Sequence, residues 1–143
     1  MHALSRIRQC LRNDGVLLDI HPQPENSRIE IWQGGTVRHL GEIDQSEDNM
    51  EIEAARAVLA SFENRSLLRV ENRGHFELLE HHDTVESWQK SWAKQGYRLV
   101  AEPALLDSAR DLLTADGGEL VIREPVQATL LRHLDAADDE VLQ

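Results

Sequence analysis

The stretch that decides the fold is ALSRIRQCLRNDGVLLDI, residues 3–20. Leu4, Ile7 and Leu11 share one helical face while arginines occupy the others, so the spacing predicts an amphipathic helix that packs through one apolar stripe. Asn-Asp-Gly then ends the helix, because glycine tolerates the left-handed backbone that closes one. The strand that follows, residues 16–20, is too uniformly apolar to have a solvent-facing side, and we expect both of its faces to be covered inside a sheet.

This order of elements resembles the segment that leads into the fifth strand of class I S-adenosylmethionine-dependent methyltransferases. That family usually reads Leu-Arg-Pro-Gly-Gly before an apolar strand, and here LRNDG at residues 11–15 precedes VLLDI, with Asn13-Asp14 in place of Pro-Gly. Later segments are similar to the second half of that family, with residues 118–124 as the last strand. The resemblance implies an α/β fold with a partial Rossmann-like mixed sheet flanked by helices, to which the sequence adds an inserted β-hairpin.

The resemblance implies that this chain is the carboxy-terminal half of such an enzyme. The family's glycine-rich loop and acidic ribose-binding residue would lie before the point where this chain starts, so no cofactor-binding residue is carried over. The implied function is methyl transfer from S-adenosylmethionine to a small-molecule acceptor. We expect the isolated chain to be inactive and to bind no cofactor, and methyl transfer to need either a longer polypeptide or a partner that supplies the missing half.

A second hypothesis is a non-catalytic α/β interaction module that forms a homodimer. A strand that lacks its neighbours would leave an open apolar edge at residues 16–20, and natural proteins cover or pair such edges. The apolar stripe of the first helix lies beside that edge. Pairing about a twofold axis covers both, so we expect a homo-oligomer whose interface includes the first 20 residues. Trp88 and Trp92, at helical spacing, belong either to the core or to this interface.

Composition predicts one domain without nucleic-acid or membrane partners. The chain has 143 residues, 41% of them hydrophobic, enough for a single domain over residues 1–134, and we expect the acidic segment 135–143 to be disordered. A net charge of −11 opposes binding to a phosphate backbone. Cys10 is the only cysteine and is expected to be buried, and with no long apolar run and no signal segment the sequence predicts a cytoplasmic protein.

Further elements follow from local patterns. Gly34-Gly35 lies between two alternating segments and predicts a hairpin rather than a phosphate loop, because no helix follows the glycines. Cap spacing and apolar periodicity predict helices over residues 48–63, after Asp83, and from Pro103. Residues 67–82 are predicted to form one or two strands interrupted at Gly74.

Asp19 and His21 are the candidate catalytic residues. They lie two residues apart near the carboxyl end of a strand, so both project to one face at the edge where open α/β sheets bind ligands. In the methyltransferase-like interpretation His21 is a general base that deprotonates the acceptor, because free imidazole titrates near neutral pH. The alternative is a polar strand exit with no chemistry.

A second polar group contains His75, Glu80, His81 and His82. On a strand, His75 and His81 project to one face, whereas Glu80 and His82 project to the other. Because one metal ion cannot easily gather all four, we predict a solvated strand end and no metal site.

Overall fold

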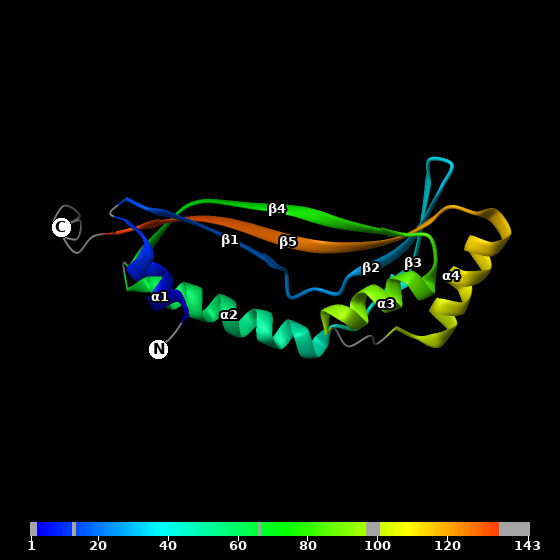
Figure 1. The fold of residues 1–143 in the computed structure, drawn as a ribbon, viewed down its shortest axis with the longest axis horizontal. Coiled ribbons are helices and arrows are strands. Elements are labelled where there is room, and N and C mark those ends of the chain that lie inside the picture. The colour runs from blue at the N-terminus through cyan, green and yellow to red at the C-terminus, as the bar shows by residue number, and fades with distance from the viewer. Residues whose placement is uncertain (1–2, 13, 66, 97–100, 135–143) are drawn as a thin grey trace.

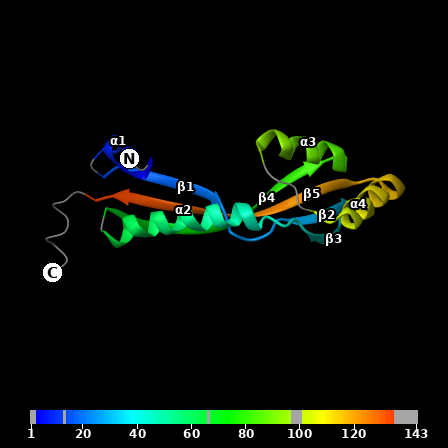
Figure 2. The same ribbon diagram turned by 90° about the horizontal axis from the view of Figure 1, so that it is seen from below.

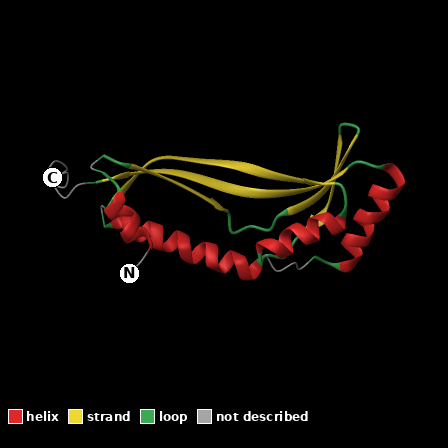
Figure 3. Cartoon of the chain, in the orientation of Figure 1, coloured by secondary structure: helices red, strands yellow, loops and turns green. Residues whose placement is uncertain are grey.

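The computed structural model describes residues 3–12, 14–65, 67–96 and 101–134. Its elements follow in the order α1 (Ala3–Cys10), β1 (Val16–Pro22), β2 (Arg28–Gln33), β3 (Thr36–Glu42), α2 (Ser46–Asn64), β4 (Leu68–His82), α3 (Val85–Gln95), α4 (Pro103–Asp116) and β5 (Glu119–His133). The molecule is elongated, with helices along one side of a long sheet (Figures 1 and 3). The chain exposes 9306 Å², against about 7,500 Å² for a compact protein of 16.3 kDa.

β5 is the central strand of this sheet. One edge of β5 pairs with β4 from Leu120 to His133, while the other edge pairs first with β2 and then with β1. β3 extends the sheet beyond β2 through the predicted hairpin at Gly34 and Gly35, whose φ angles of 53° and 82° favour glycine. One strand therefore holds both ends of the sheet together.

The α/β class is confirmed, but the Rossmann-like mixed sheet is not, because all the strand pairings in the described part of the chain are antiparallel. A single crossover helix would return the chain to the start of the sheet and make a parallel neighbour. Here two successive helices connect β4 to β5, and the chain re-enters the sheet where it left, with His82 opposite Leu120.

The two longest strands differ from their predictions, β5 in its length and β4 in its continuity. β5 continues to His133, beyond the predicted end at residue 124. β4 is continuous through Gly74, which pairs with Ala128, where the sequence predicted an interruption. The added length gives the sheet room for two separate cores.

One core lies at each end of the sheet. At the β2–β3 end, α3 and α4 pack on the strands through Ile29, Ile31, Ile43, Val85, Trp88, Trp92, Ala109, Leu120 and Ile122. At the β1 end, α2 packs on the strands through Leu59, Phe62, Leu68 and Leu131. The rings of Trp88 and Trp92 are 5.6 Å apart and buried, so both tryptophans belong to the first core and not to an interface.

The two cores lie on opposite faces of β5. Successive residues of a strand project to opposite faces, and Ile122 of the first core and Leu131 of the second are separated by an odd number of positions. Strand twist turns the sheet between them, so α2 and α3 both lie below it in Figure 1 but on different sides of β5 in Figure 2. Each end of the sheet therefore has one face under helices and one face without them.

The expectation that residues 16–20 are covered on both faces is wrong. Val16, Leu18 and Ile20 are 50%, 58% and 56% exposed, whereas Leu17 packs against the core under α2. The residues alternate because β1 lies at the edge of an antiparallel sheet that has a helix layer on one side only at this end.

Helices occur where they were predicted, with shifted ends. α2 spans residues 46–64 instead of 48–63, and Thr84 rather than Asp83 caps α3, accepting a 3.0 Å hydrogen bond from the Ser87 amide. Pro103 begins α4 as expected. The predicted burial of Cys10 is wrong: this cysteine is exposed, and Ile7 on the same helix is also exposed.

The C-terminal segment and the apolar character of the helices bear on two remaining predictions. Residues 135–143, expected to be disordered, lie outside the described residues. Among those that are described, no helix combines the length and the apolar character needed to cross a membrane.

Candidate functional site

Asp19 and His21 lie together, as their spacing predicts. The Asp19 Oδ2 atom is 2.7 Å from His21 Nδ1, and both side chains project from β1 toward α2. If Nδ1 carries the ring proton, it donates to the carboxylate and leaves Nε2 free as an acceptor, which is the orientation that a general base needs. Nε2 is buried, however, and has no hydrogen-bond partner among the described residues. The catalytic role of the pair stays a prediction.

A cavity of about 370 Å³ lies beside this pair, between α2 and the sheet. Arg56 and Glu63 of α2 line it together with Arg73 of β4 and Gln127 of β5. Arg73 and Glu63 form a 3.5 Å ion pair across it. His21 also lines this cavity, although its Nε2 atom is buried in this structure.

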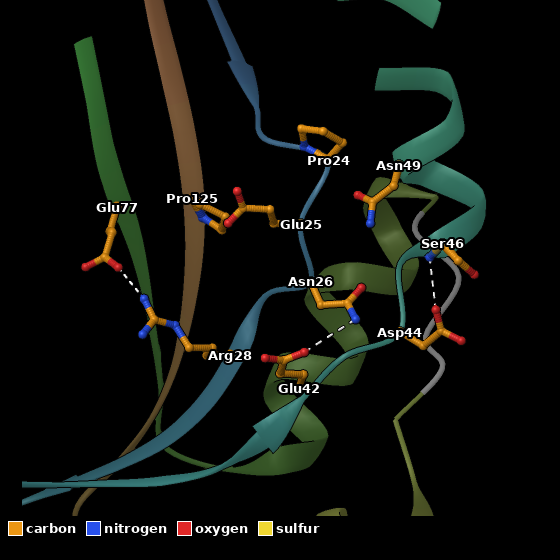
Figure 4. Close-up of a pocket in the computed structure, with 10 residues that line it drawn as sticks. All are labelled: Pro24, Glu25, Asn26, Arg28, Glu42, Asp44, Ser46, Asn49, Glu77 and Pro125. Carbon is orange, nitrogen blue, oxygen red and sulfur yellow. Dashed lines mark hydrogen bonds and ion pairs between the residues drawn. The ribbon is translucent and has the colours of Figure 1, made fainter. Parts of the chain in front are cut away.

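A larger pocket, of about 820 Å³, occupies the gap where the chain passes from β1 to β2 (Figure 4). Its polar groups bond mainly to one another: Asn26 donates to Glu42 at 3.5 Å, and Asp44 accepts from the Ser46 amide at 3.0 Å. That amide hydrogen bond lowers the pKa of Asp44. These contacts fix the start of α2 and need no ligand to explain them.

The histidines near the end of β4 do not converge. His81 bonds to Glu119 at 2.7 Å, and His82 lies 3.5 Å from Glu80, which also accepts a hydrogen bond from Trp92 at 3.1 Å. His81 and His82 therefore project to opposite faces, as the alternation along the strand predicts. Within the described ranges, no group of three or more such side chains is placed to hold a metal ion.

At the β2–β3 end, the face of the sheet without helices carries a network of charged side chains. We call it the polar face; it comprises Arg28, Glu30, Trp32, Glu77, His81, Glu119 and Arg123. Arg123 donates to both Glu30 oxygens, at 2.9 and 3.0 Å, and to Glu77, and Trp32 donates to Glu30 at 2.8 Å. Burial alone would raise the pKa of Glu30, but the hydrogen bonds from Arg123 and Trp32 outweigh burial and lower it.

At the β1 end, the face without helices is apolar. We call it the apolar face; it comprises Val16, Leu18, Ile20, Phe76, Leu78, Val126, Ala128 and Leu130. The register sets Leu18 opposite Leu130, and Phe76 opposite Val126, across three adjacent strands. Phe76 and Leu78 are 45% and 44% exposed, like their counterparts on β1.

Sequence reasoning missed this face, although a signal for it was present. Asp19 and His21 alternate with Leu18 and Ile20, which indicates two unlike faces rather than a strand buried on both sides. The uniform run at residues 16–18 concealed that alternation. The partners of this strand, on β4 and β5, are distant in the sequence, so no local pattern could show that three apolar segments lie side by side.

Comparison with known proteins adds no relative. No protein-family model matches this chain, and neither the curated proteins nor the solved structures contain a match to it.

Proposed function

We propose that this chain is a non-catalytic interaction module that self-associates through the apolar face. The observation that carries the proposal is the set of exposed Val, Leu, Ile and Phe side chains on β1 and β4, which flank less exposed apolar side chains of β5 between them. Exposed apolar side chains that lie together and have a polar rim are typical of an interface. The methyltransferase resemblance stays a prediction, and this proposal does not depend on it.

The rim of the apolar face supports the same function. Arg132 and Arg69 lie at one end, opposite each other on β5 and β4, and both contact Glu71. Glu80 and Glu124 lie at the other end. Protein interfaces commonly have an apolar centre and a polar border, and the border excludes water from the centre when the partner is bound.

A second copy is the occupant that the surface area favours. The chain exposes about 1,800 Å² more than a compact protein of its mass. A stable dimer hides about 800 Å² per partner, which is less than this excess of exposed surface. A net charge of −11 on each copy makes association through an uncharged patch the least repulsive arrangement.

Light scattering coupled to size-exclusion chromatography tests the proposal. At micromolar concentration we expect twice the chain mass of 16.3 kDa for the unmodified protein. Leu18→Glu places a charge within the apolar face and should give the mass of one chain, since burying an unpaired carboxylate opposes association. Circular dichroism checks that the variant is folded.

Val37→Glu is the matched control, because Val37 on β3 is also 50% exposed but lies outside the apolar face. It should leave the dimer intact. A monomeric unmodified protein, or equal loss of the dimer in both variants, would refute self-association through this face.

A further inference from the structure

The apolar face has an internal symmetry about the middle of β5. Ala128 lies midway between Glu124 and Arg132, with Val126 and Leu130 on either side of it. All five side chains project to the same face of the strand, because they occupy alternate positions. The face thus has small or apolar residues at its centre, a cation at one end and a carboxylate at the other.

The centre of the face is also the place where another sheet can approach most closely. Ala128 pairs with Gly74 of β4, and a Cβ atom added to Gly74 would meet no other atom within 4 Å. Glycine inside a strand often marks the close approach of a second backbone. Because φ at Gly74 is not in the left-handed region, the turn chemistry that usually explains a glycine does not apply at this position.

The two ends of the face carry opposite charge. At one end, Arg69 and Arg132 share the single carboxylate of Glu71. At the other end, Glu80 and Glu124 lie on the same face. Burial and the neighbouring Glu80 raise the pKa of Glu124, as expected of a carboxylate that lacks a cation.

We propose that two copies of this chain pack apolar face to apolar face about a twofold axis that crosses the strands at Ala128, so that Glu124 of each copy meets Arg132 of the other. A twofold axis in this direction brings opposite ends of the two faces together, whereas an axis along the strands would set like charges against each other. The Glu124–Arg132 contact then fixes the relative orientation of the copies. This inference rests on the proposed self-association and adds its geometry.

A charge-swap experiment tests the orientation. Glu124→Arg sets arginine against arginine at both ends of a homodimer, and Arg132→Glu sets glutamate against glutamate, so each variant alone should run mainly as a monomer. Mixed in equal amounts, the two variants restore both contacts. Each charge change should raise the dissociation constant of the homodimer about tenfold or more. At a concentration where each variant alone is monomeric, we therefore expect the mixture to contain a heterodimer of twice the chain mass.

Arg132 also contacts Glu71 and the carbonyl oxygen of Asp14, so Arg69→Glu serves as a second variant at the same end if Arg132→Glu fails to fold. Glu119→Arg mixed with Arg110→Glu is the matched control, because both residues lie outside the apolar face, and this pair should leave the dimer unchanged.

The outcomes separate the two proposals. An unmodified protein that is dimeric, combined with a mixture of charge variants that stays monomeric, overturns the orientation and leaves self-association standing. Charge variants that remain homodimers on their own also overturn it. An unmodified protein that is monomeric removes the self-association itself.

Discussion

The two faces of the sheet that lack helices differ in how completely their groups are satisfied. On the polar face, Glu30 is 5% exposed and accepts three hydrogen bonds, and the guanidinium of Arg123 is shared between Glu30 and Glu77. On the apolar face, Leu18 and Ile20 are more than half exposed, and no described helix covers them. The side chains of the polar face therefore satisfy one another while open to solvent, whereas those of the apolar face are the ones that the proposed second copy would cover.

The largest expected effect concerns the polar face. Glu30→Ala should lower the free energy of unfolding by about 3–5 kcal/mol, because it removes a buried carboxylate that accepts three hydrogen bonds and leaves the Arg123 guanidinium with Glu77 as its remaining partner. Glu119→Ala, which removes an exposed partner of His81, should change it by about 0.5 kcal/mol or less. Denaturant melts of both variants measure the difference. Similar losses would show that the network is not what stabilises this face.

The next effect compares a buried leucine of α2 with a leucine on the apolar face. Leu59→Ala should cost about 2–5 kcal/mol, because the side chain is buried in the second core and its loss leaves a cavity. Glu53→Ala on the exposed side of the same helix should be close to neutral, and so should Leu18→Ala at a concentration low enough to separate the copies. Equal costs for the two leucines would mean that the apolar face is covered within a single chain.

The smallest effect is the pH dependence of stability, which has opposite sign for Glu124, at the end of the apolar face, and for Glu30, on the polar face. The raised pKa of Glu124 means that its ionised form is disfavoured in the fold, so stability is fully present below the ordinary pKa and is lost as pH rises through the raised one. Glu124→Gln should therefore stabilise the monomer by about 0.5 kcal/mol near neutral pH and by nothing in acid. The lowered pKa of Glu30 acts in the other direction: its contribution is present above the ordinary pKa and is lost as pH falls. Denaturant melts between acid and neutral pH test both pH dependences. A Glu124→Gln variant that gains more stability in acid than at neutral pH would contradict the one expected for Glu124.

Local patterns predicted the elements of this fold better than their arrangement. Gly34-Gly35, Pro103 and the apolar spacing of α2 are signals that act within a few residues, and each placed its element correctly. The antiparallel order depends on the two-helix connection between β4 and β5, which no single residue specifies. For the same reason the sequence placed Asp19 and His21 on one face but could not show that α2 would enclose the imidazole.

The position of β5 has a consequence for how the chain reaches this structure. β5 follows all the other described elements in the sequence, yet β1, β2 and β4 each pair with it, and Val16 meets Arg132. While the polypeptide is being synthesised, β1 and β4 therefore cannot form their native strand pairs until residues 119–133 leave the ribosome. Such distant pairings slow folding and lengthen the time for which apolar strands are open to wrong partners. We expect nascent chains that stop before β5 to depend on chaperones, and the sheet to form in one late step from both ends of a single strand.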